Sequence, residues 1–294
     1  MIAGSSTVFT LAERLAIEFV NEGYADQLLI DSIGSGAGFE RFCVATETDI
    51  STASRLIHSD EIATCQGNGR DPIGFRIGSN VLAVVVSADN DFVEGVTLEE
   101  LAEIFSTAET WQDVRPDWPA EPILRFAPGT DSGAFNYFVE AVFEQDPAPL
   151  LNAANLQLSE VPAVLREGIK LSPFSVGFFD YAYYAEQSEN LRVLAINGTT
   201  PDATRIETND YFLSRPLFLY TTATIMQEKP QVAAFLNYAL SNATSANERV
   251  GYTAPTTARL NEGRRNWLVA MDLLQQDERL YLPKVRAESR LIVE

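Results

Sequence analysis

The sequence predicts an α/β fold, and three observations support this prediction. A strand, a turn of small residues and an amphipathic helix follow one another repeatedly along the chain. Residues 81–86 form a continuous apolar run rich in β-branched side chains, which is typical of a strand buried on both faces. Hydrophobic residues make up 46% and charged residues 21% of the 294 positions, close to the averages of globular proteins. This composition excludes a largely disordered chain.

Two of these repeated units lie near the start of the chain. Residues 2–7 lead directly into an amphipathic helix. A strand is predicted around residues 28–33, followed by a glycine-rich turn at 34–38 and a helix around 39–45. The apolar face of the first helix comprises Val8, Leu11, Leu15 and Phe19.

The middle of the chain is less regular. A Thr-Leu-Glu-Glu capping box predicts a helix at about residues 98–106. The stretch that follows contains Trp111, Trp118 and four prolines between positions 116 and 128. Because clustered prolines favour loops, we expect a surface excursion here with a short strand at residues 123–126.

Regular elements return in the second half. A turn at residues 129–133 precedes a helix with apolar side chains at helical spacing, and residues 176–179 and 217–220 predict strands. Pro230 is well placed as the first residue of a later helix. The apolar residues of the earlier helix are Phe135, Phe138, Val139, Val142 and Phe143.

Charge and length limit the classes of function. The chain has 21 basic and 41 acidic side chains, a formal net charge of −20, which argues against nucleic acid or an anionic membrane as the main partner. No apolar run approaches the ~20 residues that span a bilayer. One histidine, His58, argues against a histidine-based triad or zinc site. At roughly 100–200 residues per domain, the length predicts two domains.

The cysteines and the first residues bear on the cellular compartment. Cys43 and Cys65 lack the spacing of a metal site; they form either a disulfide, as in exported proteins, or two buried thiols. Residues 1–4 contain neither the charged nor the apolar region of a signal peptide. The protein is therefore either cytosolic or exported with its leader already removed.

Three turns rich in serine, threonine and glycine each begin a predicted helix, at residues 4–7, 34–38 and 129–133. The N-terminus of a helix has unpaired N–H groups and the positive end of the helix dipole, so it binds an anion without a formal cation. Serine and threonine are also common helix caps, so a single turn of this kind is weak evidence for a site. Three such turns in one chain favour an anion-binding site.

Other functions of glycine-rich turns do not fit. Residues 34–38 lack the third glycine of a dinucleotide-binding fingerprint, since Phe39 stands in its place. The chain contains no GxxxxGK[ST] motif, which excludes a P-loop. Ser35 is not in the GxSxG context of a hydrolase nucleophile.

Residues 49–55 end a predicted short strand with hydroxyl groups and Arg55. A guanidinium group can bind two oxygens of an anion at once. Alternatively, Arg55 is a surface residue that pairs with Asp49 or Asp60.

In their order along the chain, these segments resemble the substrate-binding proteins of bacterial phosphate ABC transporters, the PstS family, and in particular its SphX-like variant. The resemblance extends from residue 1 to about residue 255. The matching stretches are residues 4–9, 33–39, 48–55, 129–135, 177–184 and 214–218.

The resemblance implies a two-lobed α/β fold of the type II periplasmic binding proteins, with two hinge crossover strands at residues 81–86 and 217–222. Lobe one would comprise residues 1–83 and 220–294, and lobe two residues 84–219. Phosphate would lie in the cleft where helix N-termini from both lobes meet.

The resemblance also implies which residues bind phosphate. Many family members have an aspartate, which accepts the proton of hydrogen phosphate, where this chain has Ser54, and an arginine where it has Pro128. We therefore infer that Arg55 supplies the cation. Asp131 is then either the proton acceptor or a capping residue that orients Arg55. The implied set is Ser6, Thr7, Val8, Ser35, Ser54, Arg55, Asp131, Ser132, Gly133 and Ala134.

The predicted function is high-affinity binding of inorganic phosphate outside the cytoplasmic membrane, in the periplasm or at the cell surface, and its delivery to an ABC permease. We expect a monomer that is not an enzyme, without metal, cofactor or nucleic acid. One alternative is a binding protein for sulfate, molybdate or tungstate. The others are a phosphate-ester enzyme that uses the same anion cradle, and a sensor or adhesion module.

Overall fold

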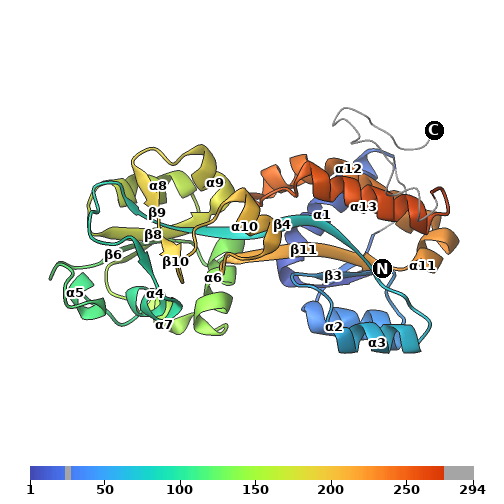
Figure 1. Cartoon of the computed structure of the whole chain (residues 1–294), viewed down its shortest axis with the longest axis horizontal. Coiled ribbons are helices and arrows are strands. Elements are labelled where there is room, and N and C mark those ends of the chain that lie inside the picture. The colour runs from blue at the N-terminus through green and yellow to red at the C-terminus, as the bar shows by residue number, and fades with distance from the viewer. Residues whose placement is uncertain (24–27, 275–294) are drawn as a thin grey trace. The chain divides into compact units, whose positions relative to one another are not determined.

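Two strands carry the chain from one compact unit to another. The computed structural model describes residues 1–23 and 28–274. Unit 1 comprises Met1–Asn80 and Arg215–Glu294, and unit 2 comprises Val81–Ser214. The first passage lies inside the 15-residue strand β4 (Ile73–Ser87), and the second lies at the start of β11 (Ser214–Thr221) (Figure 1). The lobe boundaries expected from the resemblance remain a prediction.

The sheet of unit 1 has the strand order β2-β1-β3-β11-β4. Strand β1 (Ile2–Gly4) pairs in parallel with β2 (Ile30–Ser32) and with β3 (Ile50–Ala53), and β11 pairs antiparallel with β3. Because β1, β2 and β3 run in the same direction, their carboxyl ends lie at one edge of the sheet. The segments that follow all three strands therefore leave the sheet at that edge.

Helices cover both faces of this sheet (Figure 1). The apolar sides of the long helices pack into one core with the strands. The elements are α1 (Ser6–Asn21), α2 (Ser35–Glu40), the π-helix η1 (Arg41–Ala45), α3 (Ser59–Gly67), α11 (Ala223–Glu228), α12 (Pro230–Val250) and α13 (Thr257–Ala270).

Unit 2 is built on the second half of β4. Strand β8 (Ser175–Asp180) pairs antiparallel with β4, and β6 (Leu124–Pro128) lies parallel to both β8 and β7 (Leu156–Ser159). Strand β9 (Leu191–Val193) pairs antiparallel with β4, and β5 (Gly95–Val96) pairs with β10 (Ala195–Ile196) in a separate small sheet. The helices are α4 (Leu98–Ile104), α5 (Trp111–Val114), α6 (Gly133–Phe143), α7 (Ala148–Leu151), α8 (Pro162–Lys170), α9 (Tyr181–Glu186) and α10 (Ala203–Thr208).

Most predicted elements are present. The capping box at Thr97 begins α4, and Pro230 is the first residue of α12. The helix expected around residues 39–45 begins earlier, at Ser35, and changes to a π-helix at Arg41. Gly34 explains the early start, because its φ of 88° is left-handed and lets the helix begin at the next residue.

The stretch expected as a surface excursion has exposed residues at 116–117 and 120–122 and ends in β6 where the short strand was expected, but it also anchors two tryptophans in the core of unit 2. The side chains of Trp111 and Trp118 are buried and meet edge to face at 5.7 Å. The Trp111 indole Nε1–H donates to the Phe174 carbonyl at 3.0 Å. The prolines interrupt regular structure, but the apolar side chains between them decide where the segment lies, since burying a large aromatic group is strongly favourable.

Arg125 is a buried structural residue of unit 2. Its guanidinium group donates to backbone carbonyls of Ile104, Ala108, Ile123 and Ala154. Burial lowers the pKa of Arg125 to about 10, so the side chain remains charged at neutral pH. The charge is stabilised by the four carbonyl dipoles, which hold β6 against the segments after α4 and α7.

Replacement of Arg125 should therefore destabilise the protein strongly. We expect Arg125→Met to lower the free energy of unfolding by roughly 3–5 kcal/mol, because buried carbonyl groups lose their donors. Urea unfolding followed by circular dichroism measures this. Arg14→Met, at an exposed arginine of α1, is the matched control and should change stability by less than about 1 kcal/mol. Equal losses in the two variants would contradict the structural role of Arg125.

Candidate phosphate site

The first predicted turn is fixed to the sheet by Ser5. This buried residue caps α1, its Oγ accepts a hydrogen bond from the Val8 amide at 3.4 Å, and its own amide donates to the Thr52 carbonyl at 3.0 Å. Ser6 is exposed and Thr7 is half-buried in the first turn of the helix. The turn therefore leaves Ser6 and Thr7 accessible, whereas the Val8 amide, an expected phosphate donor, already has a partner.

The second turn packs directly on the first. The Gly4 carbonyl accepts the amides of Ile33 and Gly34, at 2.9 and 2.8 Å. Glycine is required at position 4, because a Cβ atom there would lie 2.1 Å from the Thr52 carbonyl oxygen. A Cβ on Gly38 would lie 2.6 Å from the Gly4 Cα. The close approach of these glycines places the start of α2 against the ends of β1 and β3.

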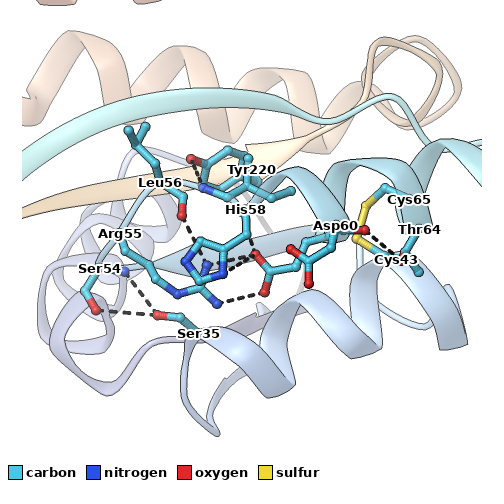
Figure 2. Close-up of polar contacts among 12 residues, drawn as sticks. Ser35, Cys43, Ser54, Arg55, Leu56, His58, Asp60, Thr64, Cys65 and Tyr220 are labelled. Carbon is cyan, nitrogen blue, oxygen red and sulfur yellow. Dashed lines mark hydrogen bonds and ion pairs between the residues drawn. A yellow bond between two sulfur atoms is a disulfide. The ribbon is translucent and has the colours of Figure 1, made fainter.

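Ser35 and Ser54 come together at this edge. The Ser54 amide donates to Ser35 Oγ at 3.2 Å, and the two hydroxyl oxygens are 3.4 Å apart (Figure 2). Both residues are half-buried. Two hydroxyl groups in contact, each able to redirect its hydrogen, form a donor pair suited to an oxyanion.

Arg55 forms a bidentate ion pair with Glu61. Its NH1 and NH2 groups donate to the two carboxylate oxygens at 2.8 and 2.7 Å, and NH1 also donates to the Leu56 carbonyl (Figure 2). The guanidinium carbon lies 5.3 Å from the centre of the Phe39 ring. The alternative interpretation of Arg55 as the partner of Asp49 or Asp60 is wrong, because its partner is Glu61.

Glu61 was not singled out in the sequence. It lies in the first turn of α3 and also accepts the His58 amide at 2.8 Å. Burial disfavours the charged form, but the hydrogen bonds from Arg55 and from the His58 amide outweigh it and lower the pKa of the Glu61 carboxyl. The hydrogen bond to Glu61 raises the pKa of Arg55. The available signal was an acidic residue three positions after the residue that caps α3, an arrangement typical of a helix start.

A disulfide supports the same region. It joins Cys43 of η1 to Cys65 of α3 (Figure 2). Arg70 donates to the carbonyls of Phe42 and Thr48, both at 2.7 Å. The helix that follows β2 and the helix that follows β3 are thus fixed to each other, with Ser54 and Arg55 in the segment between β3 and α3.

In unit 2, Ser132 caps α6. Its Oγ accepts the Ala134 amide at 3.2 Å, and its own amide donates to the Gly129 carbonyl at 3.0 Å. Asp131 is exposed. A second carboxylate, that of Glu160, lies so close to Gly129 that a Cβ there would meet its Oε1 at 1.8 Å. No sequence motif indicates Glu160, because its proximity to Gly129 depends on the pairing of β6 with β7.

Each unit therefore presents hydroxyl groups and backbone amides at a helix N-terminus, and unit 1 adds one guanidinium group that is already neutralised by a carboxylate. A helix N-terminus of this kind is suited to an anion mainly through its dipoles. Among residues 1–23 and 28–274, no cluster of three or more potential metal-ligating side chains occurs. Over the same residues, no helix has both the length and the apolar character needed to cross a membrane.

A comparison with models of protein families identifies the superfamily to which this chain belongs. Residues 1–243 match the family model described as a PBP superfamily domain. The chain belongs to this superfamily. Among relatives in the PBP superfamily, Protein SphX of Synechocystis is 34% identical over 261 residues, covering 85% of this chain and 76% of SphX. The phosphate-binding protein PstS of Staphylococcus epidermidis is 32% identical over 258 residues, covering 85% of this chain and 77% of PstS.

Solved structures agree with this assignment. A possible phosphate binding protein from Planctomyces limnophilus has a TM-score of 0.82 and 32% identity, with coverage of 92% of this chain and 97% of that protein. PstS of Borrelia burgdorferi, with a TM-score of 0.62 and 20% identity over 87% of this chain and 98% of PstS, shares the fold. The resemblance to PstS and SphX proteins and the predicted binding-protein fold are confirmed.

The Arg55–Glu61 pair should stabilise the protein in a pH-dependent way. Because the pKa of Glu61 is lower in the folded state, its contribution is present above the unfolded-state pKa and is lost as the pH falls through the folded-state value. We expect Glu61→Gln to lower the free energy of unfolding by about 1 kcal/mol at pH 7, and the difference to vanish near pH 2. Urea unfolding at both pH values measures this.

Glu262→Gln, at an exposed ion pair on α13, provides the control and should have little effect at either pH. A loss of stability that is the same at both pH values would show that Glu61 acts through packing rather than through its charge.

Proposed function

We propose that this protein binds inorganic phosphate outside the cytoplasm and delivers it to an ABC permease. One observation carries the proposal: the parallel strands β1, β2 and β3 bring the start of α1, the Ser35–Ser54 pair and Arg55 to one edge of the sheet of unit 1. The relatives named PstS are phosphate-binding proteins, which supports phosphate as the anion.

The hydrogen bonds of Arg55 leave N–H donors for an anion without breaking the pair with Glu61. A guanidinium group has five N–H donors. Glu61 takes one hydrogen from NH1 and one from NH2, and Leu56 takes another from NH1. The Nε–H and the second NH2 hydrogen lie on the remaining side of the group, where a phosphate can accept both. Glu61 then orients Arg55, which was one of the two roles expected of Asp131 from the sequence.

The resemblance to the family supports a second set of donors from unit 2. In this proposal the phosphate-binding groups of unit 2 are the Ser132 hydroxyl and the amides of Gly133 and Ala134, and those of unit 1 are Ser6, Thr7, Val8, Ser35, Ser54 and Arg55. Binding by Val8 and Ala134 requires their amides to exchange Ser5 Oγ and Ser132 Oγ, respectively, for phosphate oxygens. Asp131, exposed beside this turn, is the proposed acceptor for the phosphate proton.

In this proposal the protein acts as a monomer in the periplasm or at the cell surface. It binds and releases phosphate without a covalent step. The substrate-binding character of its relatives supports this view over an enzyme of phosphate esters. A preference for phosphate over sulfate, molybdate or tungstate depends on a group that accepts a hydrogen bond from the ligand, because fully ionised sulfate has none to donate.

Removal of the guanidinium group should weaken binding. We expect Arg55→Ala to reduce phosphate affinity by roughly 2–5 kcal/mol, the usual cost of removing one member of a desolvated charge pair. Isothermal titration calorimetry at pH 7 measures it. Arg259→Ala, at a surface ion pair of α13, is the control and should bind as the wild type does. An unchanged dissociation constant in Arg55→Ala would remove Arg55 from the site, and failure of the wild type to bind phosphate would refute the function.

Asp131 should affect selectivity if it is the acceptor. We expect Asp131→Asn to bind sulfate at least ~10-fold more tightly than the wild type does, because an amide can donate where a carboxylate repels the anion. Competition titration of phosphate against sulfate tests this. Wild-type selectivity in the variant would assign the acceptor to another group.

A further inference from the structure

The disulfide between Cys43 and Cys65 lies beside the proposed site but has no part in the function proposed above (Figure 2). The two cysteines are almost completely buried, with 2% and 0% of their surface exposed, and the chain has no others. Because a disulfide holds its two Cα atoms within about 7 Å of each other, it limits how far the helices that carry them can move apart.

Each cysteine lies about one helical turn after a residue that contacts Arg55. Phe39 of α2, which continues into η1, comes four positions before Cys43, and the Arg55 guanidinium carbon lies 5.3 Å from the centre of its ring. Glu61 of α3 comes four positions before Cys65 and accepts hydrogen bonds from Arg55 at 2.8 and 2.7 Å. Residues four apart on a helix share one face. The disulfide therefore joins the two helix faces that contact Arg55.

The backbone beside Arg55 is held by side chains from the same two helices. The Ser54 amide donates to Ser35 Oγ of α2 at 3.2 Å. The His58 amide donates to a carboxylate oxygen of Glu61, on α3, at 2.8 Å. Hydrogen bonds to side chains shift with the helix that carries them, so a change in the spacing of α2 and α3 would move the backbone around Arg55.

Other contacts would keep this region folded without the sulfur–sulfur bond. Arg70 donates to the Phe42 carbonyl at 2.7 Å, and the Asn68 side chain donates to the Cys43 carbonyl at 3.0 Å. Both donors lie after the last turn of α3, and the disulfide lies between them and Glu61 along the chain. Loss of the disulfide should therefore loosen the part of α3 that carries Glu61 and leave unit 1 folded.

We propose that the Cys43–Cys65 disulfide positions Arg55 for anion binding, so that phosphate affinity depends on the oxidation state of this bond. The inference rests on the proposed function, since it concerns the guanidinium group of that site. Cys43 and Cys65 are positioning residues, because they act through Phe39 and Glu61. In the reduced protein Arg55 samples more orientations, and binding phosphate must then restrict them at a cost in affinity.

The change of oxidation state is a thiol–disulfide exchange with a small dithiol. The dithiol supplies two electrons and two protons: the S–S bond breaks, each cysteine becomes a thiol, and the dithiol closes to its own cyclic disulfide. Because the chain has no other cysteine, the reductant acts at this bond alone. Both sulfur atoms stay in the protein, so reduction removes the covalent restraint without removing atoms from the core.

Calorimetric titration of phosphate at pH 7 tests the proposal. The samples are the oxidised wild type, the dithiol-reduced wild type and Cys43→Ala/Cys65→Ala, in which no bond can form. We expect both altered forms to bind phosphate at least ~5-fold more weakly than the oxidised wild type, because Arg55 is less preorganised. The double variant treated with the same dithiol is the control for the reductant and should bind as the untreated double variant does.

A second series of titrations separates positioning from a general loss of packing. Glu61→Gln lacks the carboxylate through which α3 holds Arg55, so reduction of this variant should change its phosphate affinity by less than ~2-fold. Glu100→Gln, which removes the corresponding partner of Arg115 in unit 2, is the matched control. Reduction should weaken phosphate binding by this control as much as by the wild type. An equal effect of reduction in Glu61→Gln and in the wild type would overturn the positioning role.

Hydrogen exchange followed by NMR measures the same change without a ligand. The His58 amide donates to Glu61 at 2.8 Å, and the Thr97 amide donates in the same way to Glu100 at 2.8 Å, in a unit that contains no cysteine. After reduction the His58 amide should exchange at least ~3-fold faster, whereas the Thr97 amide should exchange at an unchanged rate. An unchanged rate at His58 would overturn the inference, and this measurement needs only the wild type.

The outcomes separate this inference from the proposed function. If the oxidised wild type binds phosphate and the reduced wild type binds it equally well, the inference is overturned. It is also overturned if reduction unfolds the protein, as circular dichroism would show, because the bond would then support the whole unit rather than Arg55. If the oxidised wild type binds no phosphate, the proposed function itself fails.

Discussion

The parallel pairing of β1 with β2 and β3 is the constraint on which the unit 1 site depends. It aligns three carboxyl ends, and the glycines at positions 4 and 38 let the following segments approach to van der Waals contact. Hydroxyl groups from separate parts of the sequence, Ser35 and Ser54, meet only because of this alignment. Their chemistry is ordinary, and the backbone arrangement makes them a potential anion site.

Local sequence signals predicted most of the elements. The capping box before α4, the proline at the start of α12 and the apolar spacing of α6 each depend on neighbouring residues and so can be read directly. The burial of Trp111 and Trp118 could not be predicted in this way. Prolines indicate that a segment lacks regular structure, but they do not indicate whether its side chains are buried or exposed. The π-helical turn after α2 likewise has no local sequence signature.

The candidate site was predictable in its hydroxyl groups and less so in its charges. Ser35, Ser54 and Ser132 follow from motifs, whereas the partner of Arg55 was misassigned to nearby aspartates. Glu61 follows a loop and a helix start, so its distance from Arg55 depends on the conformation of both. Glu160 lies beside the turn before α6 only through strand register, which a single sequence does not specify.

The Cys43–Cys65 bond has a consequence for limited digestion of the native protein. The two cysteines are 22 positions apart, and the covalent ring that they close contains Ser51, Ser54, Arg55 and Glu61. A trypsin cut after Arg55 would open the chain inside this ring, yet both fragments would stay attached through the sulfur atoms. Only after reduction would electrophoresis show two bands, so the two fragments of a nicked molecule would still hold Ser54, Arg55 and Glu61 in one covalently linked species.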